Sequence, residues 1–509
     1  MTTAPLLANT HALGTLGRQL SFNELSYFLP SRGDGVNDMY LHLGFRAPER
    51  LIQPARVHAI WAAQRLKHPL LSAHIVSGPD VSSARFEYII PESVDKAIQT
   101  AAEESDIRTN LILGYLNGPR LLSSTRTSFF FLARDPEDDH QWHFMLCALH
   151  CIGDGMALHA CAHDMLTLLG QATGADELRE VVAAELAKQT NVPRSMEAAL
   201  PQLSKGFKTA AAMINEQLTE RKQIGGQAFP KTKGAERKTV VPTVSFDEER
   251  TKRILARCKA NGVSVSNVTF ALCNIAWARM LVKGSVTTEL GPKSPSLMYT
   301  ALNTRPWLDN QSKDESFFRL CIGYFNVITP SFIPSNQNDV ARTFWHRARI
   351  AKIQSSKAVK SPFVLPRTQI TARKRAEQSI KWAKIDDDAA AARAGKTVDA
   401  APVPAPKVEE VVLPTQPLVP KSAPATALIG LSLLGNLDGM YKHSSYGDIK
   451  LNLLTTGSRQ RAGAMLLFSY TFVGKLWLCF GYDMNGFQAG IVEEFWKEVL
   501  DGVDEFLGD

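Results

Sequence analysis

Apolar residues along this chain follow two spacings, one typical of buried strands and one typical of amphipathic helices. Residues 142–149 form a nearly continuous apolar run of the length of a buried strand, and from Met156 onward apolar residues recur at helical spacing. Between the two runs lies the hexapeptide HCIGDG at 150–155. We therefore predict a strand and a helix joined by a tight turn that carries a histidine and an aspartate.

The same patterns predict that the first half of the chain is a mixed sheet with helices packed on it. We expect a strand at 39–45 followed by a helix at 54–71, and we expect the strand at 127–132 to pair beside the one that precedes His150. The acidic turn at 135–139 would join those two strands. Strands are expected at 39–45, 86–90 and 127–132, and short strand and helix signals mix within 16–29.

A change of composition marks a boundary before the second half. Residues 220–238 are rich in Lys, Gln, Gly and Pro, which predicts an exposed linker between a domain at 1–219 and a domain at 239–509. The segment 385–426 is rich in Ala, Pro, Lys and Asp, and we expect it to be a disordered insertion. The second half otherwise predicts strands at 239–246, 296–308 and 320–330, helices at 247–261, 264–282, 340–384 and 491–507, and further strands between 428 and 482.

Length and composition fit a two-domain globular protein. The chain has 509 residues, which is longer than a chain that folds around a single core usually is. Its composition, 45% apolar and 21% charged, is ordinary for a globular protein. Its seven cysteines are odd in number and sit mostly in apolar runs, so we expect reduced thiols and a cytoplasmic protein. No leader peptide or membrane span is expected, because no apolar run reaches about 18 residues. The charge of +7 is mild, and gives no reason to expect a nucleic-acid partner.

His150 is the candidate catalytic residue, because an imidazole can accept a hydroxyl proton near neutral pH if its ring is held in place. Asp154 stands where a helix N-cap would be, and Gly153 and Gly155 are expected to allow positive φ and close approach. The alternative is a structural histidine that ends a core strand. A metal site would also be conceivable here, but Cys147, Cys151, His159 and His163 lack the usual spacing of zinc ligands, so no metal is expected.

The HCIGDG segment resembles the HxxxDG signature of the chloramphenicol-acetyltransferase-like superfamily, which includes CoA-dependent acyltransferases and condensation domains of nonribosomal peptide synthetases. The segments SLLGNLDGMY and YTFVGKLWLCFGYDMNGF are similar to the fungal trichothecene 15-O-acetyltransferase group. This resemblance implies an α/β fold of two acetyltransferase-like domains, each a mixed sheet with flanking helices, and a tunnel between them that holds His150. The DFGWG signature of plant relatives is missing.

The resemblance also assigns roles to residues of the second half. Arg305 would form an ion pair with Asp154, and Gly155 would belong to the same catalytic loop. Asn303, Asn326 and Ser469 would bind substrate, with Asn326 and Ser469 as candidate oxyanion donors. From the residues alone, Arg305 could also be a solvated turn arginine, and Asn326 could be a polar group on an edge strand. The basic helical run within 340–384 is open to three interpretations, a solvated face, a weak nuclear signal or a contact with CoA phosphates.

We therefore expect a monomeric O-acyltransferase that uses acetyl-CoA or another short acyl-CoA and a small-molecule alcohol, with a hydroxylated fungal terpenoid as the expected acceptor. One alternative is a condensation-type domain that acts on carrier-bound substrates, although Leu149 replaces the first histidine of the usual pair and no carrier domain is expected in this chain. Glycolipid acylation, or a catalytically inactive binding module of the same fold, would also be compatible with the resemblance.

Overall fold

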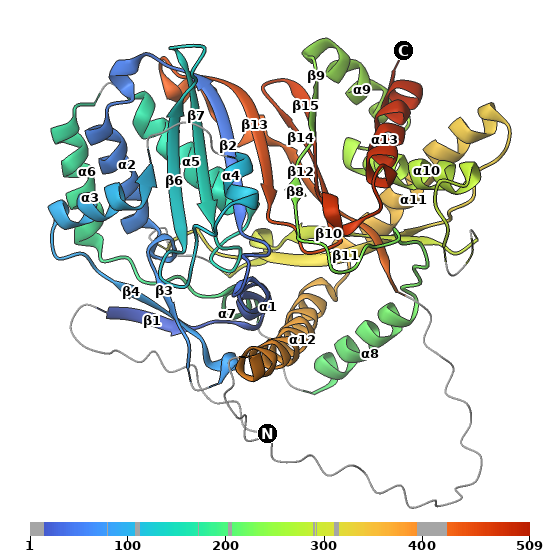
Figure 1. The fold of residues 1–509 in the computed structure, drawn as a ribbon, viewed down its shortest axis with the longest axis horizontal. Helices are drawn as coiled ribbons and strands as arrows, with labels where there is room; N and C mark the ends of the chain where they lie inside the picture. Colours follow the sequence, from blue (N-terminus) through green and yellow to red (C-terminus); the bar gives the residue numbers. More distant parts are fainter. Residues whose placement is uncertain are drawn as a thin grey trace, which may run out of the picture.

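The computed structural model describes residues 15–78, 80–106, 112–171, 173–201, 206–288, 291, 293–309, 315–393 and 425–508. Within these ranges the chain forms two lobes that lie side by side, each built on a β-sheet (Figure 1). A small third sheet lies beside the first lobe and contains β1 (Thr15–Gln19), β3 (His74–Val76) and β4 (Arg85–Ile89).

The first lobe is built on a five-stranded sheet in the order β13-β2-β7-β6-β5. The central strand β7 pairs antiparallel with both β2 and β6, and its last residue, Ala148, lies opposite Met39 and Ser128. This confirms the predicted pairing of the strand before His150, and it fixes where that strand ends. The strands are β2 (Met39–Arg46), β5 (Ser105–Asp106), β6 (Ser128–Arg134), β7 (Gln141–Ala148) and β13 (Lys450–Ser458).

Helices cover this sheet and extend the first lobe outward. Helix α2 packs against α3, α5 and α6, and in Figure 1 the helices α2, α3 and α6 lie to the left of the strands of this sheet. The helices of this half are α1 (Phe22–Ser31), α2 (Pro54–Lys67), α3 (Val94–Glu103), α4 (Ile112–Asn117), α5 (Gly155–Gly170), α6 (Ala175–Lys188), α7 (Met196–Ala199) and α8 (Phe207–Arg221).

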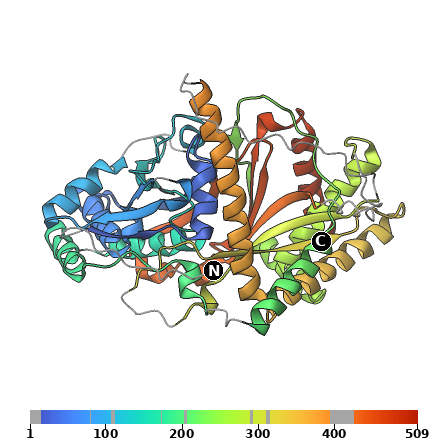
Figure 2. The same cartoon turned by 90° about the horizontal axis from the view of Figure 1, so that it is seen from below.

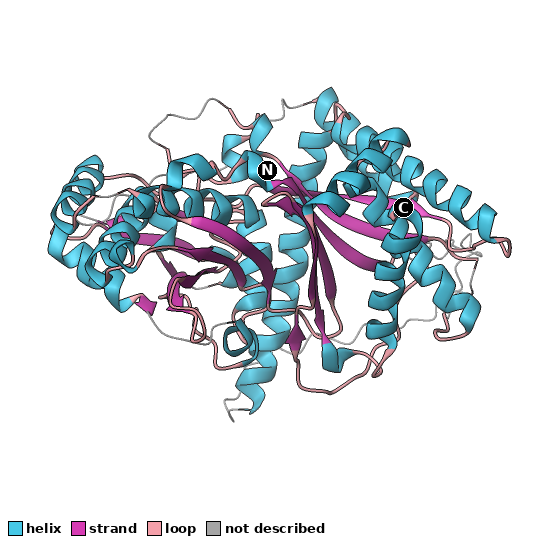
Figure 3. Ribbon diagram, turned by 90° about the horizontal axis from the view of Figure 1, so that it is seen from above, coloured by secondary structure: helices cyan, strands magenta, loops and turns pink. Residues whose placement is uncertain are grey.

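The second lobe is built on a sheet in the order β11-β10-β12-β14-β15-β8, with β9 also paired to β15. Its helices lie on the outer side of the strands (Figure 3). The strands are β8 (Thr239–Val240), β9 (Thr243–Phe246), β10 (Ser296–Asn303), β11 (Ile322–Thr329), β12 (Ala427–Asn436), β14 (Met465–Phe472) and β15 (Lys475–Asp483). The helices are α9 (Glu248–Ala260), α10 (Val265–Lys283), α11 (Gln337–Val359) and α13 (Ile491–Leu507).

The two faces of β14 belong to different cores. Leu467 packs in the core of the second lobe, whereas Phe468 and Tyr470 pack in the core of the first. The Tyr470 hydroxyl donates a hydrogen bond to the Leu454 carbonyl of β13 at 2.7 Å. The second sheet is therefore covered by its own helices on one face and by the first lobe on part of the other.

Strand β13 departs from the predicted division of the chain at 219/239. It lies within the second half of the sequence but pairs antiparallel with β2 over Lys450–Ser458, at the edge of the sheet of the first lobe. The lobes are therefore not two consecutive segments. The sequence does not predict that β13 joins the sheet of the first lobe, because an alternating pattern of apolar residues identifies a strand but not the sheet to which it belongs.

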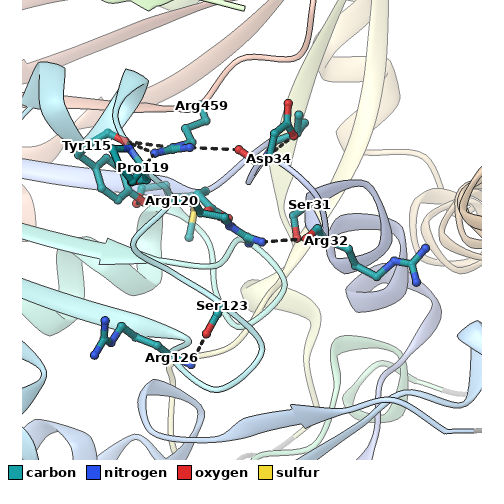
Figure 4. A network of polar contacts seen from close by, with 12 residues as sticks. Ser31, Arg32, Asp34, Tyr115, Pro119, Arg120, Ser123, Arg126 and Arg459 are labelled. Atoms are coloured by element: carbon teal, nitrogen blue, oxygen red, sulfur yellow. Dashed lines mark hydrogen bonds and ion pairs between the residues drawn. The ribbon is translucent and has the colours of Figure 1, made fainter. Parts of the chain in front are cut away.

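Arg459 anchors the chain where it leaves β13. This side chain is 3% exposed, and it donates hydrogen bonds to the carbonyl oxygens of Tyr115, Gly118 and Asp34 (Figure 4). One guanidinium thus satisfies several buried carbonyls that would otherwise be costly to bury. It ties the returning segment of the second half to the turn after α1 and to the C-terminal end of α4.

Two further segments differ from the predictions. The segment 220–238 is not a wholly exposed linker, because Gln227 is buried. Its Nε2 donates a hydrogen bond to the Ser294 carbonyl at 2.7 Å, and its Oε1 accepts one from the Trp277 indole at 2.8 Å. The predicted disordered start at 385 is also wrong, since α12 (Val364–Arg393) continues as a helix past this point. Residues 394–424 of that predicted insertion lie outside the described residues.

Helix α12 lies between the two lobes, where it packs against α1, α8 and β11 (Figure 2). It is the second of two helices that replace the single helical run predicted at 340–384. Helix α10 is the one described helix that is long and apolar enough to cross a bilayer, and 72% of that stretch is buried inside the protein. This burial is typical of a core helix.

Candidate active site

The loop after β7 holds His150 by local hydrogen bonds that follow from its sequence. The Leu149 amide donates to the Thr127 carbonyl at 2.9 Å, and Asp154 caps α5 by accepting from the Ala157 amide at 3.1 Å. The predicted order of strand, turn and capped helix is therefore confirmed. A capping aspartate satisfies amide groups that a helix leaves unpaired at its N-terminus.

The role of glycine in this loop is to leave room for close packing, and not to adopt positive φ. Neither Gly153 nor Gly155 is among the described residues with positive φ, so that expectation is wrong. A Cβ on Gly153 would lie 2.6 Å from the ring of Phe318, which is fully buried, whereas a Cβ on Gly155 would lie 3.7 Å from Leu434. Gly153 is needed because the loop packs directly on the aromatic ring.

Substitution of Gly153 by alanine is expected to lower the free energy of unfolding by about 1 to 3 kcal/mol, the usual cost of overpacking a buried contact. Gly155→Ala is the matched control, because its Cβ meets only an ordinary van der Waals contact and should leave the unfolding midpoint nearly unchanged. Urea denaturation of both variants measures the difference. Equal stability of the two proteins would show that the Phe318 contact does not constrain the loop.

The His150 ring is oriented so that one nitrogen stays available. Its Nδ1 lies 3.0 Å from the Gly153 carbonyl oxygen, which can only accept, so Nδ1 carries the proton and Nε2 keeps its lone pair. No described residue hydrogen-bonds to Nε2. The ring is half-buried and stacks on Tyr27, with 4.2 Å between the ring centroids and an angle of 29°. This geometry suits a proton acceptor.

The surroundings of His150 favour its neutral form. Burial lowers the pKa of the imidazole below its ordinary value and Arg375 adds to this effect, while Asp154 and the Gly153 carbonyl oppose it. The ring therefore enters a reaction at neutral pH without a proton on Nε2.

Asp154 and Arg305 form the ion pair that the resemblance implied. Nη1 of Arg305 lies 2.9 Å from each carboxylate oxygen of Asp154, and Nη2 donates to the Arg319 carbonyl at 2.8 Å. Oδ2 also accepts from the Cys321 amide at 2.7 Å. The charge of Asp154 and its hydrogen bond raise the pKa of Arg305, although burial alone would lower it. Both oxygens of Asp154 are thus engaged with α5 and the second lobe, and no described hydrogen bond joins Asp154 to His150.

A second contact between the lobes lies directly beside His150. The hydroxyl of Tyr27, on α1, forms a hydrogen bond with the hydroxyl of Tyr324, on β11. The Arg375 guanidinium of α12 lies over both rings, 5.0 Å from the centroid of Tyr27 and 4.4 Å from that of Tyr324. No described carboxylate forms an ion pair with Arg375. Sequence reasoning missed Tyr27 and Tyr324, because an aromatic residue within an apolar run normally indicates only a core position.

Comparison with known proteins places this geometry in a known fold. No protein-family model matches the sequence, and no curated protein matches it. The solved structure of TRI3 trichothecene 15-O-acetyltransferase from Fusarium sporotrichioides superposes with a TM-score of 0.75 at 13% identity, over 99% of this chain and 98% of that chain. The chain has the chloramphenicol-acetyltransferase-like fold.

Condensation-type structures share this fold. The cyclization-docking bidomain of EpoB from Sorangium cellulosum matches with a TM-score of 0.57 at 12% identity, over 97% of this chain and 85% of that chain. The condensation domain of the monacolin K polyketide synthase MokA matches with a TM-score of 0.54 at 10% identity, over 97% of this chain and 98% of that chain. The chain therefore shares its fold both with an acetyltransferase and with condensation-type structures.

The three predicted substrate-binding residues are not all placed as expected. The exposed Asn303 uses its Oδ1 to accept from the Arg305 amide at 3.1 Å, so it supports the arginine turn. Asn326 shares a face of β11 with Tyr324, but its amide donates to Gln223 at 2.6 Å. Both residues therefore already have protein partners.

Ser469 lies on the wrong face of its sheet for a contact with the His150 loop. It is opposite Leu433 and Leu478, which pack in or against the core of the second lobe. The serine on the other face is Ser432, which is opposite Phe468 of the first core. A one-residue difference in position reverses the side of a strand, and this difference was not visible in the sequence.

Cys151 and the two histidines considered as metal ligands are buried or hydrogen-bonded within the fold. Cys151 is buried, and burial raises the pKa of its thiol well above its ordinary range, so it is not a thiolate at neutral pH. His159 and His163 each use Nδ1 to contact a tyrosine hydroxyl, at 2.8 and 2.6 Å. Among the described residues, no group of three or more His, Cys, Asp or Glu side chains is arranged to hold a metal ion.

Proposed function

We propose that this protein is a CoA-dependent O-acyltransferase in which His150 is the general base. The observation that carries the proposal is the state of the imidazole, whose Nδ1 proton is held by the Gly153 carbonyl while Nε2 has no described hydrogen-bond partner. The loop that bears it is tied to the second lobe through Asp154 and Arg305. The shared fold with an acetyltransferase and with condensation domains supports acyl transfer as the reaction class.

The chemistry proposed for this site is direct transfer. His150 Nε2 takes the proton of the acceptor hydroxyl while the hydroxyl oxygen attacks the thioester carbonyl. The tetrahedral intermediate collapses to the ester and expels the CoA thiolate, which takes the proton back from His150. The buried, protonated thiol of Cys151 supports a route without an acyl-enzyme. We propose no oxyanion donor, because Asn326 and Ser469 are not placed for that role.

For the substrates, we propose acetyl-CoA or another short acyl-CoA and a hydroxylated fungal terpenoid of the trichothecene type, with the enzyme acting as a cytoplasmic monomer. The match to the trichothecene acetyltransferase over 99% of the chain supports this choice. A condensation-type reaction on carrier-bound substrates is the second candidate, and the matches to EpoB and MokA support it.

The proposal is tested by incubating the protein with acetyl-CoA and a panel of small alcohols, amines and carrier-bound acceptors, and by following the release of free thiol. We expect release that depends on a small hydroxylated acceptor. Release only with carrier-bound amines would favour the condensation reaction, and no release with any acceptor would favour a binding module without activity.

The pH dependence of the reaction should respond to Arg375. Because the base must be neutral, kcat/KM falls as pH drops through the pKa of His150, which burial and Arg375 lower. Arg375→Met should therefore move the acid limb of the profile to higher pH. Arg373→Met on the same helix removes an exposed charge over Phe22 and should leave the limb in place. Profiles that coincide for wild type and Arg375→Met would show that Arg375 does not act on His150.

A further inference from the structure

We propose that the first lobe contains a second ligand site, which binds a small carboxylate with an apolar body. The site is a cavity of about 360 Å³ between α2, α3, the end of β4 and the segment that leads into β6. This volume lies at the lower end of the range for small-molecule pockets. All of its lining residues fall between 62 and 128, so none belongs to the His150 loop or to the second lobe. The inference does not depend on the proposed acyl transfer.

More than half of the lining residues are polar or charged, among them Glu92, Lys96 and Glu104, but apolar atoms supply most of the surface inside the cavity. Leu66 and Leu71 line it and are nearly fully buried, and Ala97 of α3 is 5% exposed. Ile89, at the end of β4, also lines the cavity but is 62% exposed. An isoleucine that is this exposed beside a cavity marks a mouth through which an apolar group could enter. Burial of that group would supply most of the binding energy.

Arg65 supplies a positive charge to the cavity without a carboxylate partner of its own. This side chain is half-buried and its guanidinium lies 5.7 Å from the centroid of the Trp61 ring, but no described residue forms an ion pair or a hydrogen bond with it. The acid that acts on it, Glu104, is already held by Arg126 at 2.5 Å. Burial lowers the pKa of Arg65 to about 10, which still leaves the guanidinium charged at neutral pH. A partly buried charge without a carboxylate partner is costly, so an anionic ligand would relieve it.

The hydroxyl of Tyr88 also suits a carboxylate ligand. It lines the cavity and is 3% exposed, and no described residue hydrogen-bonds to its hydroxyl. Arg65 lines the same cavity, and its charge opposes the rise that burial causes in the pKa of Tyr88. By contrast, the hydroxyls of Thr127 and Ser128 already donate to the carbonyls of Leu70 and Leu71. A planar guanidinium and one hydroxyl match the two oxygens of a carboxylate, and the apolar surface of the walls matches a hydrocarbon body.

The test is isothermal titration of the full chain with sodium octanoate, and with octan-1-ol as the uncharged probe of equal length. Octanoate should bind more tightly than octan-1-ol, and Arg65→Met should weaken octanoate binding by about tenfold or more, since one charge-assisted hydrogen bond is worth at least this factor. Tyr88→Phe preserves the shape of the side chain and should cause a smaller loss. Arg179→Met, which removes an exposed arginine paired with Asp95 outside the cavity, should bind like wild type.

Competition with acetyl-CoA separates this cavity from the His150 site. Octanoate bound in the cavity should stay bound when acetyl-CoA is added, whether or not the protein transfers acetyl groups. Absence of octanoate binding, equal affinity in Arg65→Met, or displacement by acetyl-CoA would each overturn the proposal. If Arg65→Met does not fold, as judged by its melting curve, unchanged affinity in Tyr88→Phe overturns it as well.

Discussion

Replacement of His150 by alanine is expected to lower turnover with acetyl-CoA and an accepted alcohol by a factor of about 10² to 10⁴, the usual contribution of a general base. The fold should remain intact, because the ring makes one hydrogen bond, to Gly153 of its own loop, and one stacking contact, with Tyr27. Steady-state kcat and the melting temperature of the variant measure the two effects separately.

His140→Ala is the matched control for this substitution. His140 is an exposed histidine in the turn before β7, where its backbone carbonyl, and not its ring, accepts from the Ala47 amide at 3.0 Å. Its removal should leave turnover unchanged. Activity of His150→Ala within a few-fold of wild type, with the fold intact, would remove His150 from the mechanism.

The ion pair between Asp154 and Arg305 should give the second large effect. Asp154 is 2% exposed and accepts from the Arg305 guanidinium and from the amides of Ala157 and Cys321. Loss of one partner leaves the other charge buried, which costs about 3 to 5 kcal/mol. We expect Asp154→Asn and Arg305→Gln each to impair activity strongly, because the His150 loop loses its hold on the second lobe.

The double variant distinguishes this anchoring role from a proton relay. If the two side chains act through one contact, the double variant should lose much less activity than the sum of the single losses. A relay through Asp154 predicts instead that Asp154→Asn shifts the pH optimum and that Arg305→Gln matters little. Additive losses would show that the pair does not act as a unit. The double-mutant cycle is measured as kcat/KM across the pH range.

The parts of the site that the sequence predicts are those that neighbouring residues determine. The apolar run before His150 predicts β7, and Asp154 predicts the cap of α5, because a strand end and a helix start each depend on a few adjacent residues. The ion pair with Arg305 spans 151 positions, and only the family resemblance suggested it.

Contacts between distant segments were the ones that sequence reasoning missed. Tyr27, Tyr324 and Arg375 come from α1, β11 and α12, and no spacing along the chain relates them. Strand β13 joins the sheet of the first lobe for the same reason. The misplacement of Ser469 has another cause, since the pattern predicted the strand correctly but not which of its two faces meets the first lobe.

The most direct test of the central claim is to measure thiol release and ester formation together, with acetyl-CoA and a hydroxylated trichothecene-type sesquiterpenoid, for wild type and His150→Ala. Wild type should release one thiol for each ester formed, and both products should fall together in the variant. Thiol release without ester, or ester formation that His150→Ala leaves unchanged, would contradict direct acyl transfer by His150.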